Sequence, residues 1–269
     1  MSAGRFDFER RALAASGGVL VAFLAVPLVA LFVTTTVVDF GAGLLHPLVW
    51  PALRLSLLTT FISLVLVVVF GTPLAWSLAR ASGRITHTLE TLVQMPIVMP
   101  PAVAGVALLL AFGRRGLLAG WLYPEGVAVT FTTTAVVMAE VFVSAPFFVQ
   151  AATSAFRRID AKLLVVARTF GASPLRVFFR IGIPLAAPGL VAGAAMSWAR
   201  ALGEFGATLM FAGNLEGRTQ TLPLAIYTAL EADLRAAQAL SIVLVVVAFA
   251  LLLFVRAALR RYTRHEEAR

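Results

Sequence analysis

The sequence lacks the residues that several classes of protein chemistry require. It contains no cysteine, which excludes disulfides, thiolate metal sites and cysteine nucleophiles. Its three histidines, His46, His87 and His265, lie far apart, and no two of them share a metal-ligand spacing on one helix. Charged residues make up only 13% of the chain, against about 25% in an average soluble domain. We therefore expect neither a metal site nor an ordinary cytosolic enzyme.

Lysine is almost absent, which bears on ATP hydrolysis. Of the 22 basic residues, 21 are arginine and one is Lys162. A Walker-type phosphate site needs a lysine between glycine and serine or threonine, whereas Lys162 follows Ala161. The chain also has no His-Glu-x-x-His or Gly-x-Ser-x-Gly motif and no close carboxylate pair in an apolar run. We predict no catalytic residue and no cofactor bound by this chain, so a membrane-embedded enzyme has little support.

Apolar residues, in contrast, are abundant. They form 60% of the 269 residues, and the mean hydropathy is +0.94. These are too many for a water-soluble core of this size, so lipid must surround much of the chain. Six continuous runs have about the length that crosses a bilayer, roughly 20 residues: Ala12–Val38, Leu55–Ala79, Thr91–Gly113, Gly126–Phe156, Ile181–Ala199 and Ala236–Val255. Because they do not alternate as barrel strands do, we expect an all-α integral membrane protein with six transmembrane helices.

The distribution of basic residues predicts the orientation. The first run, 12–38, follows three arginines, but its 27 uncharged residues exceed the roughly 7–15 of a signal peptide, so we interpret it as a retained span. With the N-terminus inside, 16 basic residues lie in inner segments, five lie in outer segments and Arg200 lies within a span. This bias predicts that both termini are cytoplasmic. The net charge of +9 therefore suits a membrane surface and does not imply nucleic acid.

The longest inner segment, near residues 157–180, has the pattern of two short helices. Apolar residues between 163 and 170 recur at helical spacing, Gly171 ends that helix, and Ser173 caps a second one with Pro174 at its first position. One interpretation is an amphipathic helix on the inner leaflet. The other is an element that docks into a groove of a partner protein.

The spacing of this loop resembles the signature loop of ABC-importer permeases, which is Glu-Ala-Ala, three residues, Gly, nine residues and Ile-x-Leu-Pro. Ala167, Gly171, Ile181 and Pro184 fit that frame. Val165 and Val166 replace the family's Glu and first Ala, and Ile183 replaces its Leu, so the loop lacks the usual acidic residue. The resemblance implies that the loop couples the chain to a separate ATPase, through Lys162, Leu163, Leu164, Val165, Val166, Ala167, Arg168, Gly171, Ala172 and Ser173.

The fifth run and the following outer segment resemble the molybdate branch of this family. The residues that carry this are Arg200-Ala-Leu-Gly-Glu-Phe-Gly-Ala-Thr208, Gly213-Asn214 and Gly217-Arg-Thr-Gln-Thr-Leu-Pro223, together with Gln94-Met-Pro-Ile-Val-Met-Pro-Pro101. The resemblance covers most of residues 50–255. It implies the ABC type-1 importer fold, one permease domain over 1–269 with its core at about 53–256, and location in a prokaryotic inner or plasma membrane.

Charged and helix-breaking residues inside the spans are the candidates for the pathway. Arg200 and Glu204 are four residues apart and each costs at least about 2.5–3.5 kcal/mol in mid-membrane. They form either a structural ion pair, with each other or with Glu140, or part of a gate.

Pro96, Pro100 and Pro101 predict a kinked third helix that lines the pathway, or a simple kink. The pathway or gate candidates are Pro100, Glu140, Arg200, Gly203, Glu204, Gly206 and Thr208.

The outer segment after the fifth run offers hydrogen-bond donors. Asn214, Arg218, Thr219 and Gln220 suit an oxyanion or the surface of a binding protein, and a solvated loop is the alternative.

The resemblance implies a set of partners and a function. The partners are a second copy of the chain, two ABC ATPase subunits that bind ATP and Mg, and an extracytoplasmic molybdate-binding protein. The function is molybdate uptake, with tungstate as an additional or alternative substrate because the two tetrahedral dianions are alike. A sulfate or thiosulfate permease is an alternative in the same family, and an ion-coupled secondary transporter is one outside it.

Overall fold

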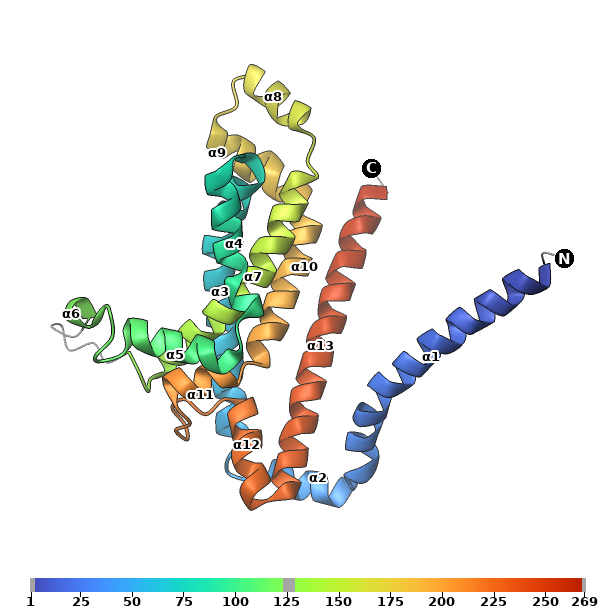
Figure 1. Ribbon diagram of the computed structural model, residues 1–269, viewed down its shortest axis with the longest axis vertical. Coiled ribbons are helices and arrows are strands. Elements are labelled where there is room, and N and C mark those ends of the chain that lie inside the picture. The colour runs from blue at the N-terminus through green and yellow to red at the C-terminus, as the bar shows by residue number, and fades with distance from the viewer. Residues whose placement is uncertain (1–2, 123–128, 268–269) are drawn as a thin grey trace.

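A computed structural model describes residues 3–122 and 129–267, and within these residues the regular elements are all helical. In chain order they are α1 (Ala3–Thr34), α2 (Val37–Leu44), α3 (Val49–Arg80), α4 (Arg84–Val98), α5 (Pro101–Phe112), α6 (Ala119–Leu122), α7 (Thr133–Arg157), α8 (Ala161–Thr169), α9 (Pro174–Val177), the π-helical turn η1 (Phe178–Gly182), α10 (Ile183–Leu202), α11 (Gly206–Ala212), α12 (Leu222–Ala232) and α13 (Leu234–Glu267). Figure 1 shows α3, α4, α7 and α10 as a bundle, with α13 alongside and α1 diverging from it.

Five of the predicted spans are single helical stretches, and the count reaches the predicted six when one bent pair of helices is taken as a span. The five are residues 15–34, 49–80, 133–157, 174–202 and 234–253, and the sixth is α4 with α5. The fifth continues through η1, so it begins before the predicted Ile181. The fourth begins at Thr133, because the Thr132 hydroxyl accepts the Ala135 N–H and caps α7. The predicted start at Gly126 lies outside the described residues.

The third span differs from the predicted kinked helix. α4 and α5 are separate helices, and the chain bends by 118° between them. With 15 and 12 residues they are about 22 Å and 18 Å long, so neither crosses a core of about 30 Å alone. Met99 and Pro100 are extended, and Pro101 starts α5. The consecutive prolines therefore stop one helix and begin another instead of bending one.

The first span also ends earlier than predicted. α1 stops at Thr34, and the Thr36 hydroxyl accepts the Asp39 N–H to cap a separate helix, α2. α2 packs along α13, where a Cβ on Gly43 would lie 2.6 Å from that of Ala239. Arg235 and Asp39 add an ion pair of 3.2 Å across the same contact. α2 thus lies across the base of α13, against its first turns (Figure 1).

Three buried clusters hold the bundle together along its length. The first joins α3, α7 and the 157–180 loop, and includes Phe148, Phe156 and Val177. The second joins α5, α7 and α11, and the third joins the start of α3 to α12 and α13. Together the three clusters place buried side chains at the tip that carries α8, in the middle of the bundle and at the end that carries α12.

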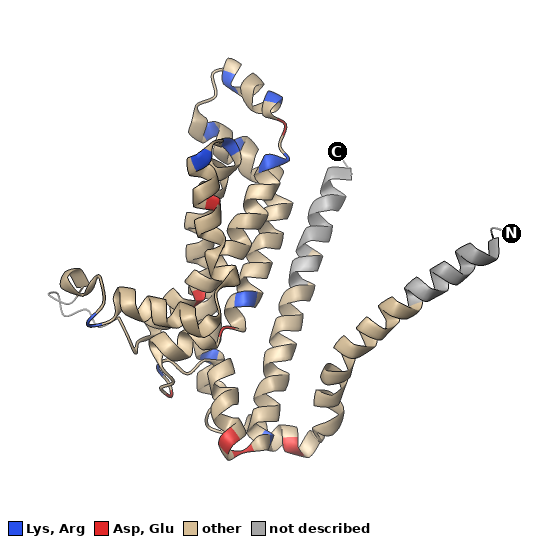
Figure 2. Cartoon of the chain, in the orientation of Figure 1, with Lys and Arg blue, Asp and Glu red and all other residues tan. Residues whose placement is uncertain are grey.

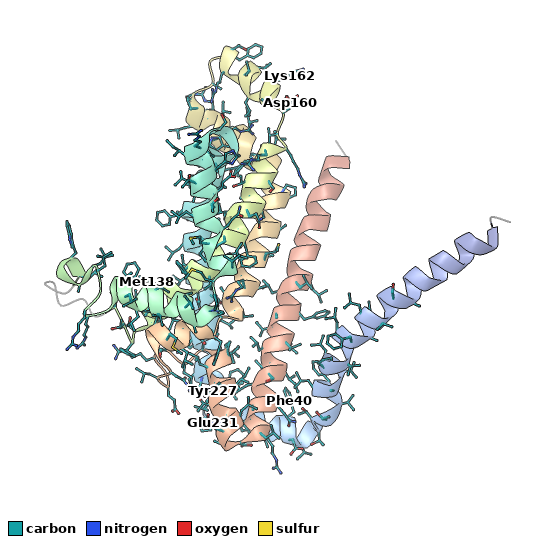
Figure 3. The ribbon with its side chains drawn as sticks, viewed as in Figure 1. Phe40, Met138, Asp160, Lys162, Tyr227 and Glu231 are labelled. Atoms are coloured by element: carbon teal, nitrogen blue, oxygen red, sulfur yellow. The ribbon has the colours of Figure 1, made fainter. Side chains whose placement is uncertain are left out.

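Charge separates toward the two ends of the bundle. Figure 2 shows blue residues gathered on α8, α9 and the adjacent helix ends, and red residues at the opposite end near α2 and α12. The tip carries Lys162, and Glu231 lies at the far end (Figure 3). The arrangement agrees with the basic inner loops counted in the sequence.

Candidate functional site: the inner loop and the broken spans

The loop between α7 and α10 has the predicted helix, glycine and helix. α8 begins after Asp160, whose side chain accepts the Lys162 N–H at 2.9 Å. Gly171 ends it with φ +81°, a left-handed conformation that favours glycine. The Ser173 hydroxyl then accepts the Arg176 N–H, and Pro174 opens α9. The loop is a compact cap on the basic end of the bundle.

One face of this loop holds it to the bundle, and the other is exposed. Leu164 is buried, and Ala167 and Ala172 pack against the same cluster as Phe156. The exposed face carries apolar and basic side chains: Lys162, Leu163, Val165, Val166 and Arg168. Val165, which occupies the family's Glu position, is 59% exposed. Because exposed aliphatic side chains at the tip favour a protein partner, this face is the best candidate for docking.

Arg200 and Glu204 form the predicted ion pair, but not within one helix. Their closest N and O atoms are 2.6 Å apart, with Glu204 buried and Arg200 partly accessible. α10 ends at Leu202, and the other Glu204 oxygen accepts the Ala207 N–H at 2.7 Å. Glu204 therefore joins the end of α10 to the first turn of α11, where a carboxylate also complements the helix dipole.

Glu140 lies in a separate contact between α3 and α7. Its two oxygens accept hydrogen bonds from Thr59 at 2.8 Å and Ser63 at 2.7 Å, and the side chain is 1% exposed. Among the ion pairs of the described residues, none joins Glu140 to Arg200. The arrangement makes Glu140 a polar tie between two helices.

The start of α5, in the bent span, touches the start of α11, the short helix that follows the fifth span. A Cβ on Gly206 would lie 2.7 Å from the Pro101 Cβ, so the start of α11 packs directly on the start of α5. Thr208 is fully buried next to this contact. A Cβ on Gly203, in contrast, would lie 3.8 Å from its nearest neighbour, an ordinary contact distance. Close packing therefore explains why position 206 is glycine, but it does not explain Gly203. Pro100 is the extended residue that leads the chain into α5.

The outer segment after α11 is mostly tied to the protein itself. Asn214 and Gln220 both donate to the Thr228 hydroxyl, at 2.8 and 3.2 Å, and Thr219 accepts the Leu215 N–H. Gln220 and Thr219 are buried, and the Arg218 side chain is exposed. Of the four predicted donors, Arg218 is thus the one whose side chain faces outward.

A polar stripe on α3 was not predicted from the sequence. Ser56, Thr59, Thr60 and Ser63 are all buried, and they bond to α12, Glu140 and Trp198. Their spacing of three and four residues inside an apolar run was the available signal, because it places every hydroxyl on one helix face. Glu90, which pairs with Arg157 between α4 and α7, was not predicted either.

Comparison with known proteins agrees with this architecture. The chain is 46% identical over 228 residues to the molybdenum transport system permease protein ModB of Mycobacterium tuberculosis, covering 85% of this chain and 86% of that one. It is 37% identical to the molybdate/tungstate transport system permease protein WtpB of Pyrococcus abyssi, over 78% and 80% of the chains.

A solved structure shares the fold. A bacterial alginate ABC transporter, in complex with an alginate-bound periplasmic protein, matches 96% of both chains with a TM-score of 0.76 at 17% identity. Residues 71–265 match the family model described as the inner membrane component of binding-protein-dependent transport systems. The chain therefore belongs to this family of multi-pass inner membrane proteins, the permease subunits of ABC importers, which work with an ATPase and a substrate-binding protein.

Proposed function

We propose that this permease forms the transmembrane pathway for molybdate uptake, with tungstate as a second substrate. The observation that carries the proposal is the 46% identity, over 85% of the chain, to a permease named for molybdenum transport. A dianion moving inward against an inside-negative potential costs about 4.6 kcal/mol per 100 mV, at about 2.3 kcal/mol per charge. Uptake of a scarce oxyanion must therefore be driven, and ATP on a partner supplies that energy.

The exposed face of the inner loop docks on the ATPase. Leu163, Val165 and Val166 project from α8 with more than half of each side chain exposed, on a loop whose other face is buried. Basic Lys162 and Arg168 flank them and suit acidic groups on a partner. The missing Glu at position 165 makes the contact more apolar than in the family pattern.

A second copy of the chain completes the pathway, and each copy binds one ATPase subunit. α4 presents Ile85 and Leu92 with exposures of 78% and 61%, seven residues apart and therefore on one face of the helix. A dianion that faced lipid directly would be too costly to move across the membrane, so a transport route on this side of the bundle needs a second protein surface to enclose it. A twofold arrangement supplies one without a further gene product.

Arg200 and the helix breaks form the gate between the outer and inner halves. Arg200 is partly accessible while its partner Glu204 is buried, so one edge of the guanidinium can face a passing anion while another edge stays paired with the carboxylate. Glu140, another of the pathway candidates, supports the gate by tying α7 to α3 through Thr59 and Ser63. When ATP closes the ATPase pair, the inner loop moves and the helices switch from inward-facing to outward-facing.

The test is uptake in proteoliposomes that contain the permease, its ATPase and the loaded binding protein. We expect radioactive molybdate to accumulate only with ATP, to persist in excess sulfate and to fall with excess tungstate. Uptake abolished by sulfate would assign the chain to the sulfate branch, and uptake independent of ATP would contradict the proposal.

A further inference from the structure

The base of the inner loop rests on an aromatic cluster that also includes the end of α3. The Trp76 ring meets Phe156 of α7 edge-on, with centroids 5.2 Å apart, and Phe178 of η1 at 5.5 Å. Phe178 directly follows α9, so one ring touches the helix before the loop and the helix after it. Such pairs lose energy when their geometry changes.

Arg80 fixes the position of this tryptophan. Its guanidinium carbon lies 4.8 Å from the Trp76 ring centroid, and its Nη2 donates to the Phe156 carbonyl at 2.7 Å. That carbonyl belongs to the last turn of α7, where a cation is favourable. One side chain of α3 therefore holds both Trp76 and the point where α7 enters the loop.

Gly182 brings the other side of the loop against the same ring. A Cβ on this residue would lie 2.7 Å from Cζ3 of Trp76, so the backbone where η1 joins α10 touches the indole directly. The Ile183 N–H donates to the Phe178 carbonyl five residues back, which makes this a π turn. π turns occur mostly as single turns and often at functional sites. This turn lets the loop and α10 meet Trp76 in one fixed register.

We propose that Trp76, Arg80 and Gly182 form a joint that transmits movement of the inner loop into α3 and α10. The inference rests on the proposed function, because it assumes that the loop docks on an ATPase. The buried side of the loop is packed into the same cluster through Leu164, and Val177 is fully buried there. A push on α8 therefore reaches Trp76 through packed atoms, without an intervening loop. The three residues position the helices and touch neither substrate nor ATP.

The test compares transport with ATP hydrolysis in the reconstituted complex of permease, ATPase and binding protein. In Trp76→Ala we expect the ATPase rate to stay near wild type while the oxyanion transported per ATP falls about tenfold, in the range of typical coupling effects. Trp76→Phe keeps an aromatic ring, so we expect it to restore much of the ratio of oxyanion transported to ATP hydrolysed. Trp121→Ala, on an exposed tryptophan of α6, is the matched control and leaves the ratio unchanged.

A second variant covers the case in which Trp76→Ala does not assemble. Gly182→Ala puts a methyl group into the indole ring and lowers the ratio, whereas Gly17→Ala, with no atom within 4 Å of the new Cβ, does not. A wild-type ratio in Gly182→Ala, or loss of assembly in both variants, overturns the joint. The ratio is measured with whichever oxyanion the wild type transports, so a failure of the molybdate proposal appears in the wild type and a failure of the joint in the variants.

Discussion

The carboxylate of Glu204 lies between two helices, 2.6 Å from the Arg200 guanidinium and bonded through its other oxygen to the first turn of α11. Glu204→Ala leaves Arg200 unpaired in the membrane and α11 uncapped. We expect a loss of about 3 kcal/mol of stability, consistent with removal of one partner from a buried pair. Thermal unfolding of the purified permease in detergent measures it.

A double variant separates the ion pair from the cap. In Arg200→Gln with Glu204→Gln the loss should be smaller than the sum of the two single losses, because neither change then leaves a lone charge. Additive losses would mean that the two side chains do not stabilise each other.

Glu140 offers a second test, which distinguishes a structural tie from a pathway group. Glu140→Gln keeps the shape but removes one of the two oxygens that accept from Thr59 and Ser63. We expect stability to fall by about 1 kcal/mol, the typical contribution of one hydrogen bond, and uptake per folded permease to stay near wild type. Loss of uptake with unchanged stability would instead place Glu140 in the transport route.

The contact between α5 and α11 predicts that substitution of Gly206 is destabilising and that substitution of the nearby Gly203 is not. Gly206→Ala drives a methyl group to 2.7 Å from the Pro101 Cβ, so we expect a loss of about 1–3 kcal/mol from overpacking. Gly203→Ala meets nothing within 3.8 Å and has φ −91°, so it should be close to neutral. Paired unfolding curves decide this, and equal effects would contradict close packing of α11 on α5.

The inner loop was predictable because its signals are local. Gly171, Ser173 and Pro174 each fix the backbone next to them, and the observed turn, cap and helix start follow from these residues alone. The ion pair of Arg200 and Glu204 was predictable for a similar reason, since only a few residues separate them. The helix break between them was not, because the Gly-Glu-Phe sequence does not by itself end a helix in lipid.

The angle between α4 and α5 depends on contacts that are distant in sequence. The prolines at 100 and 101 predict an interruption, but the 118° turn also requires α5 to pack on α11 at Gly105 and Gly206. α12 was not predicted, because its 11 residues are too few for a span and its place was assigned to an outer loop. Both features are decided by tertiary packing.

The absence of cysteine makes the predicted orientation directly measurable. Ser82→Cys and Glu216→Cys each introduce one thiol at an exposed position, in the connection between α3 and α4 and in the segment after α11 respectively. In intact cells we expect a membrane-impermeant maleimide to label Glu216→Cys and to label Ser82→Cys only after the membrane is opened. The reverse pattern would place both termini outside.

Gly171 separates docking from folding of the membrane part. It has φ +81°, where a residue with a side chain is strained by about 1–2 kcal/mol, and no atom lies within 4 Å of a new Cβ. Gly171→Glu therefore distorts the turn between α8 and α9 and adds a charge at the docking face without disturbing the buried clusters. We expect normal amounts of permease in the membrane, weak co-purification with the ATPase and no uptake. Gly171→Ala carries the backbone strain without the charge, so it should retain part of the uptake, and full transport by Gly171→Glu would show that the loop does not dock there.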